Sequence, residues 1–301
     1  MNILFRADSS STIGTGHIMR DLVLAKQYSN DNFIFAVREL DGNINHKIDK
    51  ADYKKVVLKT NDIKELNKLI KKLKIDLLVI DHYEIDYSFE KKLKDKNANL
   101  KILSFDDTYE KHYCDILLNH NISANKKKYK GLVPKNCELR CGSNYTLLRD
   151  EFLKEKKKKR KKTDTKVKTI FIAIGGADHS NINIDILKVL KKFENIKVNL
   201  VTTNANKNLK QLEKYCKNKD WISLNINSNK IAKLMGKSDL AIVTPSVTVN
   251  EVYYLGIPMI VIKTADNQID MYEYLKKKKQ LVIKKFHKNK LFKKLEKLGL
   301  K

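Results

Sequence analysis

Short, continuously apolar segments alternate with longer amphipathic segments along nearly the whole chain, and this alternation limits the available folds more than any other feature. In the first half it predicts strands at 2–5, 33–37, 76–81, 101–105 and 115–119, and helices at 18–28, 63–73 and 88–96. Strands that are apolar on both faces and separated by helices form a parallel sheet covered on both sides. The pattern therefore predicts an α/β fold.

The alternation restarts after a lysine-rich run at 154–162. Strands are expected at 169–174, 197–201, 221–224, 240–243 and 258–262, and helices at 182–193, 209–215, 231–235 and 247–255. A chain of 301 residues is long enough for two domains of roughly 150 residues each. We predict an N-terminal Rossmann-like domain at 1–153, a solvated lysine-rich linker at 154–166, a C-terminal Rossmann-like domain at 167–285 and a basic tail at 286–301. A nuclear-localisation signal is the alternative for the lysine run.

The net charge of +27 raises the question of a nucleic-acid partner. Only six of the 62 basic residues are arginines, whereas nucleic-acid surfaces favour arginine because its planar fork binds phosphates and guanine edges in pairs. The lysines are spread along expected helical faces, so we expect solvated surfaces and no nucleic-acid partner. No apolar run reaches the ~18–20 residues of a membrane span, and no signal-peptide layout is present, so a cytoplasmic protein is expected.

The four cysteines and seven histidines do not form a metal-binding pattern. Cys137 and Cys141 lack the two-residue spacing of a zinc knuckle or redox pair, and no histidine cluster completes a site. The four cysteines fit a reduced compartment. We expect neither a metal nor a cofactor.

The segment 6–17 follows the first expected strand and precedes the first expected helix. Gly14 and Gly16 permit positive φ and a close approach of the backbone to a ligand, and the helix start offers unpaired N–H groups to a phosphate or polarised oxygen. A dinucleotide fingerprint needs a third glycine where this chain has Met19. The loop is therefore interpreted as a sugar or phosphate site.

His17 closes this loop. A helix N-terminus disfavours a charged imidazole, so the ring is expected to stay neutral and able to accept a proton, as a general base must. Asp8 is the nearest candidate to orient it. From local sequence alone, a histidine that merely packs on the first helical turn is an equal alternative.

Polar residues also follow two later strands of the first half. Asp81, His82 and Tyr83 end the most apolar strand, so they reach the edge of the sheet where ligands bind. Tyr83 could hydrogen-bond a substrate and His82 could relay a proton, although most such residues simply cap the next helix. Asp106 and Asp107 suggest a carboxylate pair for a metal, but adjacent aspartates point in different directions on an extended chain.

Two strand–helix junctions of the second half resemble each other in chemistry. Gly175, Gly176 and Asp178 turn from a strand toward a helix, a shape that can cradle a diphosphate through backbone N–H groups. Ser246 lies at the other junction, where hydroxyls can bind phosphate and Glu251 can accept hydrogen bonds from both ribose hydroxyls. Together they predict a nucleoside-diphosphate site, with two well-capped helices as the alternative.

Combined motifs then point to a known family. The chain resembles the UDP-sugar hydrolases of pseudaminic acid biosynthesis through nearly all of its length to about residue 285. The resemblance lies in the segments 5–11, 13–18, 20–22, 80–83, 103–107, 114–119, 131–134, 140–142, 145, 148–149, 151–152, 175–178, 249–251 and 267–268. Ala177 and the segment 244–246 depart from the family pattern.

The resemblance implies a glycosyltransferase-B fold, with two Rossmann-like domains facing across a cleft that holds the substrate. It also implies metal-independent hydrolysis of a UDP-sugar with inversion at the anomeric centre by a monomer. His17 is then the base that activates water, and Tyr83 and Asn267 position the substrate. Arg149, Asn250, Glu251 and Gln268 are then substrate or UDP ligands. A UDP-sugar-dependent glycosyltransferase is the first alternative, and a lysine-driven nucleic-acid binder is the second.

Overall fold

The chain folds into two compact units, Met1–Leu148 and Arg149–Lys301. The computed structural model describes residues 1–28, 31–158, 168–176 and 178–300. In the part of the chain so described, none of the helices is both long and apolar enough to cross a membrane.

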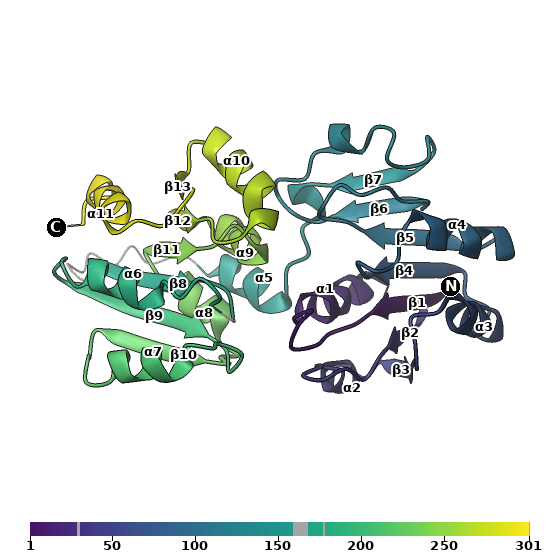
Figure 1. Cartoon of the computed structure of the whole chain (residues 1–301), viewed down its shortest axis with the longest axis horizontal. Coiled ribbons are helices and arrows are strands. Elements are labelled where there is room, and N and C mark those ends of the chain that lie inside the picture. Colours follow the sequence, from purple (N-terminus) through teal and green to yellow (C-terminus); the bar gives the residue numbers. More distant parts are fainter. Residues whose placement is uncertain (29–30, 159–167, 177, 301) are drawn as a thin grey trace. The chain divides into compact units, whose positions relative to one another are not determined.

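The first unit is built on a seven-stranded parallel sheet (Figure 1). Its order is β3-β2-β1-β4-β5-β6-β7. The strands are β1 (Asn2–Ala7), β2 (Asn32–Val37), β3 (Lys54–Val57), β4 (Leu77–Asp81), β5 (Lys101–Phe105), β6 (Ile116–Asn119) and β7 (Glu138–Cys141). Its α-helices are α1 (Gly16–Ala25), α2 (His46–Lys50), α3 (Ile63–Leu73) and α4 (Tyr87–Lys96), and its short 3-10 turns are Lys26–Tyr28, Lys126–Tyr129 and Ser143–Tyr145.

Both faces of this sheet are buried, because side chains alternate along each strand. In β1, Ile3 and Phe5 pack on the face covered by α1 and α2, whereas Leu4 packs on the face covered by α3 and α4. Phe5 stacks on Phe35 of β2 with ring centroids 4.9 Å apart. The two layers explain why these strands are continuously apolar in sequence.

The second unit has a six-stranded parallel sheet in the order β10-β9-β8-β11-β12-β13 (Figure 1). The strands are β8 (Lys168–Ala173), β9 (Ile196–Thr202), β10 (Ile222–Ile226), β11 (Leu240–Val243), β12 (Met259–Ile262) and β13 (Leu281–Ile283). The α-helices are α5 (Asp150–Lys157), α6 (Asn183–Leu190), α7 (Leu209–Cys216), α8 (Ile231–Gly236), α9 (Val247–Leu255), α10 (Ile269–Lys277) and α11 (Lys288–Lys297), and Asp266–Gln268 forms a 3-10 turn. Two parallel α/β sheets confirm the predicted fold class.

Two segments that the sequence reading set apart from the domains contain regular structure. The expected linker, residues 154–166, begins inside α5, which packs against α8 and α9, and most of it lies outside the described residues. The expected basic tail, residues 286–301, contains α11, whose Leu291 and Leu295 are fully buried against the second sheet. Phe292 of α11 stacks on Phe193, with ring centroids 4.9 Å apart.

Strand order determines where a ligand can bind in each unit. In both sheets the first strand, β1 or β8, lies between the second and the fourth strand of its unit. Successive strands are therefore added first on one side of it and then on the other, so the strand order reverses there. Ligands of such sheets bind beyond the carboxyl ends of the strands at this switch point. The switch point is flanked by the loops after β1 and β4 in the first unit, and by those after β8 and β11 in the second.

Candidate functional site

The loop between β1 and α1 is held by short hydrogen bonds of its own. Ser10 and Gly14 pair through their backbones, and the Ser10 hydroxyl accepts from the backbone N–H groups of Thr12 and Ile13. Gly14 uses the freedom of glycine and has φ +88°, whereas Gly16 begins α1 and does not have positive φ. A Cβ at either glycine would meet no atom within 4 Å, so both backbones face open space.

His17, on the first turn of α1, is paired with Asp81 at the end of β4. Its Nδ1 lies 2.6 Å from Asp81 Oδ1, and both side chains are almost fully buried. β1 and β4 are adjacent, with Ala7 opposite Asp81, so the strand order itself brings the histidine and the carboxylate together. The sequence reading named Asp8 as the orienting group; that choice was wrong, because Asp8 binds other partners.

Arg20 completes this pair one helical turn after His17. Its Nε and Nη2 each lie 2.5 Å from one oxygen of Asp81, a bidentate arrangement. Burial alone would raise the pKa of Asp81, but Arg20 and then His17 hold the pKa of this carboxyl well below its usual range. Asp81 is therefore ionised and accepts hydrogen bonds from the guanidinium of Arg20 and from Nδ1 of His17.

Tyr83, a second predicted site residue, lies beside His17. The two rings meet edge to face with centroids 5.0 Å apart. The tyrosine hydroxyl donates a hydrogen bond to Asp107 Oδ1 at 3.1 Å. Asp107 Oδ2 also accepts a hydrogen bond from Arg20 Nη1 at 3.4 Å. Tyr83 is 65% exposed, so it remains accessible to a substrate while Asp107 orients its hydroxyl.

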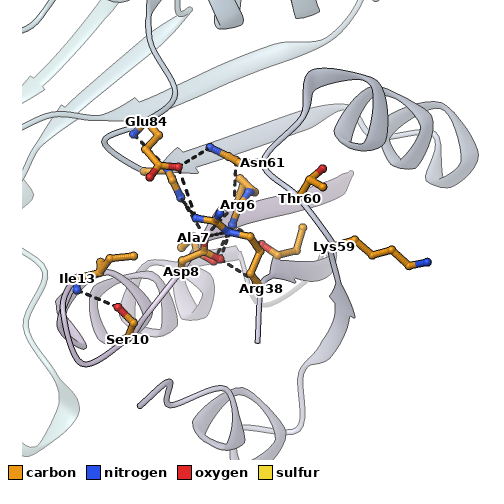
Figure 2. Close-up of polar contacts among 12 residues, drawn as sticks. Arg6, Ala7, Asp8, Ser10, Ile13, Arg38, Lys59, Thr60, Asn61 and Glu84 are labelled. Atoms are coloured by element: carbon orange, nitrogen blue, oxygen red, sulfur yellow. Dashed lines mark hydrogen bonds and ion pairs between the residues drawn. The ribbon is translucent and has the colours of Figure 1, made fainter. Parts of the chain in front are cut away.

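Asp8 anchors a separate buried cluster at the same sheet edge (Figure 2). Arg6 binds both of its oxygens at 2.7 and 2.8 Å, and Arg38 donates to it from its backbone N–H and from Nε. His82 Nδ1 accepts from the backbone of Glu84, so its protonated Nε2 donates to Asp8 at 3.0 Å. Burial would raise the pKa of Asp8, but His82 and the two arginines hold it far below its usual range. The cluster ties the ends of β1, β2 and β4 together.

The two adjacent aspartates after β5 have different partners. Asp106 accepts hydrogen bonds from Thr108 and from the backbone of the following turn, whereas Asp107 faces Tyr83 and Arg20. Their divergence is the geometry expected of neighbours on an extended strand. Within the described residues, no three His, Cys, Asp or Glu side chains are grouped to hold a metal ion.

In the second unit, the turn after β8 contains the predicted glycine pair. Gly175 has φ +80° and open space around it, and Gly176 lies so close to Thr203 that a Cβ would come within 2.9 Å of that side chain. Asp178 is almost fully buried, and its carboxylate accepts from Asn183 at 2.7 Å and Ser180 at 3.3 Å. Asp178 thus shapes the turn itself, while both glycine backbones are exposed.

The loop after β11 brings the other predicted nucleotide ligands to the neighbouring strand end. Ser246 precedes α9, and Asn250 and Glu251 lie on the first turns of that helix, both buried. Arg149 Nη2 lies 2.9 Å from Glu251 Oε1. Burial raises the pKa of Glu251 to about 7 despite this arginine. A carboxyl so placed changes protonation near neutral pH.

Asn267 and Gln268 lie in the 3-10 turn after β12. Gln268 Oε1 accepts from the backbone N–H of Thr264 at 2.8 Å and of Ala265 at 3.2 Å, so this side chain holds its own loop. Asn267 is exposed. The structure therefore gives Gln268 a local partner and leaves Asn267 accessible.

Sequence reasoning missed Arg20 and Arg38 as parts of the site and did not assign Asp81 to His17. Arg20 carried a usable signal, because residues three apart on a helix share a face and Arg20 follows His17 by three. The Asp81 pairing required the order of β1 and β4, and Arg38 required the position of β2. Neither can be read from local sequence.

No known protein-family model matches this chain. Among curated proteins it is 44% identical over 278 residues to the UDP-2,4-diacetamido-2,4,6-trideoxy-β-L-altropyranose hydrolase of Campylobacter jejuni, covering 92% of this chain and 97% of that protein. It is also 32% identical over 286 residues to an uncharacterised protein, MJ1062, of Methanocaldococcus jannaschii, covering 92% of this chain and 59% of that one.

Solved structures show the same fold at low sequence identity. MurG of Acinetobacter baumannii matches with a TM-score of 0.66 and 12% identity, covering 99% of this chain and 90% of that one. Anabaena HepE, solved in complex with UDP-glucose, matches with a TM-score of 0.62 at 12% identity and the same coverage. These likenesses confirm the predicted glycosyltransferase-B fold. By its identity over almost the full length of the Campylobacter protein, the chain belongs to the family of UDP-2,4-diacetamido-2,4,6-trideoxy-β-L-altropyranose hydrolases.

Proposed function

We propose that this chain hydrolyses UDP-2,4-diacetamido-2,4,6-trideoxy-β-L-altropyranose at the anomeric C–O bond and releases UDP and the free sugar. The relative's printed activity supports the substrate. The observation that carries the chemistry is the His17–Asp81 hydrogen bond at the switch point of the first sheet. The sequence resemblance places this reaction in pseudaminic acid biosynthesis.

Asp81 determines which ring nitrogen of His17 can act. An ionised carboxylate only accepts hydrogen bonds, so at 2.6 Å the proton lies on Nδ1 and Nε2 carries the free lone pair. Within the described residues, Nε2 has no hydrogen-bond partner. A histidine held in one tautomer by a buried aspartate is the arrangement that general bases use in hydrolases.

In the proposed reaction, Nε2 takes a proton from water while the water oxygen attacks the anomeric carbon. The new C–O bond forms as the bond to the β-phosphate oxygen breaks, so the electron pair leaves with UDP and the configuration inverts. Asp81 stays ionised and stabilises the imidazolium. UDP requires neither a metal nor a cofactor to leave, since a pyrophosphate oxygen is a good leaving group once its charge is stabilised.

The second unit supplies the nucleotide contacts in this proposal. The backbone N–H groups near Gly175 and Gly176 and the start of α9 at Ser246 suit the diphosphate. Glu251 and Asn250 suit the ribose, with Arg149 adjusting the charge of Glu251. Tyr83 and Asn267, both exposed, position the sugar.

The test is to incubate the purified protein with the UDP-sugar in H₂¹⁸O without an acceptor. We expect equal amounts of UDP and free sugar, and UDP that carries no ¹⁸O, because the attack is at carbon. An early proton NMR spectrum should show the inverted anomer first. Label in the UDP phosphate would contradict attack at the anomeric carbon.

The alternative is a glycosyltransferase of the same fold, which the structural likeness to MurG favours. Such an enzyme transfers the sugar to an acceptor hydroxyl and leaves the UDP-sugar intact when no acceptor is present. The same incubation therefore distinguishes the two, because an unchanged UDP-sugar excludes hydrolysis. A monomeric, cytoplasmic enzyme with no nucleic-acid partner is part of the proposal. It predicts no DNA binding at ~0.15 M salt despite the basic surface.

A further inference from the structure

Asp21 is a buried carboxyl group on the helix that carries His17. It follows His17 by four residues on α1, so the two side chains share a face of the helix. Helical side chains lean toward the N-terminus, which directs the Asp21 carboxyl toward the turn of His17 and Arg20. Asp21 is fully buried, and neither of its oxygens has a hydrogen-bond partner within the described residues.

An ionised carboxylate in that position would be costly, because nothing solvates or pairs with it. A protonated carboxyl carries one O–H donor and needs one acceptor. The charged group to consider is Asp81 at the end of β4, whose negative charge acts directly on the Asp21 carboxyl.

Asp81 offers about four acceptor positions, two on each oxygen. His17 Nδ1 and Arg20 Nη2 occupy Oδ1, and Arg20 Nε occupies one position on Oδ2. Among the contacts that the structure records, one acceptor position on Asp81 Oδ2 is unoccupied. It lies on the carboxylate that fixes the tautomer of His17.

We propose that Asp21 remains protonated at neutral pH and donates its O–H to the free position on Asp81 Oδ2, as a positioning residue for the His17–Asp81 pair. The inference rests on the proposed hydrolase function. Asp21 touches no reacting atom and keeps its proton throughout. The proton that leaves water goes to His17 Nε2, and Asp81 remains the acceptor of every donor around it.

The charges around Asp21 agree with this protonation state. Burial and then the charge of Asp81 raise its pKa well above the ordinary value, and Arg20 opposes them only in part. His120, which follows β6, also lies within electrostatic reach of Arg20 and Asp81. Burial lowers the pKa of His120 to about 3, so it is neutral and adds no positive charge to favour an ionised Asp21. Asp107 contacts Arg20 and Tyr83, and the Tyr83 ring also packs against His17.

The first experiment measures the protonation state of Asp21 directly and needs no substrate. Aspartate is labelled with carbon-13 at its carboxyl carbon, and the Asp21 signal is assigned by its loss in Asp21→Asn, or in Asp21→Ser if the first variant does not fold. We expect that signal at the chemical shift of a protonated carboxyl near neutral pH. The signal of the exposed Asp95 serves as the control. An Asp21 signal at the ionised shift overturns the proposal, whether or not the enzyme hydrolyses UDP-sugars.

The second experiment reads the consequence for catalysis. Asp21→Asn keeps an N–H donor of similar shape, so kcat should stay within about threefold of wild type. The pH at which kcat/KM falls on the acidic side of its pH profile (the acidic limb) should not change. Asp21→Leu removes the donor and should lower kcat by about 10- to 100-fold at unchanged KM, the range for a hydrogen bond to a charged group. If Asp21 were ionised, Asp21→Asn would remove a charge near His17 and move the acidic limb to lower pH by about one unit. That shift would contradict the proposal.

Discussion

The switch points of the two sheets have the same strand order but differ in the polar groups that they present. In the first unit, charged side chains already bind one another: Arg20 and His17 bind Asp81, and the Asp8 cluster closes beside them. In the second unit, the corresponding edge presents exposed glycine backbone at 175–176, and the carboxyl of Glu251, paired with Arg149, has its pKa raised to about 7 by burial.

This difference matches two different tasks. A general base needs a fixed tautomer and a fixed direction, so its partners must be in place before the substrate arrives. A nucleotide site needs unpaired donors and acceptors that the ligand itself will satisfy. We therefore expect changes in the first unit to alter turnover or folding, and changes in the second to alter UDP affinity.

The largest effect is expected from His17→Leu. Without the proposed base, turnover should fall by about 10² to 10⁴-fold, which is roughly 3 to 5 kcal/mol of transition-state stabilisation. The affinity for UDP should be unchanged, because its proposed ligands belong to the second unit. Steady-state kinetics and calorimetric titration with UDP measure the two quantities. The exposed His46, changed to leucine, is the matched control. Near-normal turnover in His17→Leu would remove His17 from the role.

The next effect is on stability. Asp8→Ala leaves Arg6 buried without its carboxylate, and should destabilise the first unit by roughly 3 kcal/mol, the lower end for breaking a buried pair because Arg38 is partly exposed. Hydrogen exchange of peptides from β1 and β2 reports on this unit. The single tryptophan, Trp221, reports on the second unit and should unfold as in wild type.

The exposed ion pair of Asp95 with Lys91 provides the matched control for this variant. Asp95→Ala should change stability by less than about 1 kcal/mol, because exposed pairs contribute little. Equal effects of the two substitutions would show that the Asp8 cluster does not hold the first sheet edge together.

Sequence reasoning recovered what depends on local pattern. The strand and helix periods predicted most elements, and they placed Gly14, His17 and Tyr83 after β1 and β4, where the structure has them. It missed the strands β3, β7 and β13. It also paired His17 with Asp8, its neighbour in sequence, because only the adjacency of β1 and β4 brings Asp81 to the ring. Pairings across a sheet depend on strand order, which local periodicity does not contain.

A smaller effect is expected on UDP binding in the second unit. Ribose hydroxyls donate to a carboxylate, so UDP should bind the ionised form of Glu251, whose pKa in the free protein is raised to about 7 by burial. Affinity should fall about tenfold for each pH unit below that value. The terminal phosphate of UDP also changes protonation in this pH range. Its effect on affinity is the same in wild type and in Glu251→Gln, so the variant supplies the reference curve. Parallel pH curves for the two proteins would exclude Glu251 as a ribose ligand.

The smallest effect concerns the pH dependence of stability in the first unit, where two buried groups oppose each other. Burial lowers the pKa of His120 to about 3, so between about pH 5 and 6.5 only the unfolded chain binds that proton, and stability rises with pH by roughly 1.4 kcal/mol per unit. The raised pKa of Asp21 has the opposite sign, because there only the folded chain keeps the proton. The two slopes should cancel in the wild type.

Single substitutions should expose each slope. His120→Asn leaves the Asp21 contribution, so its stability should decrease as pH rises through this window, whereas Asp21→Asn should become more stable with rising pH. The double variant should again be nearly flat, and hydrogen exchange of β4 peptides at several pH values measures all four proteins. Asp8 and Asp81, whose pKa values are lowered, titrate below the window, and His112, whose pKa is raised by Glu90 against burial, titrates above it. A flat Asp21→Asn profile would mean that His120 is protonated in the folded chain, which would contradict its lowered pKa.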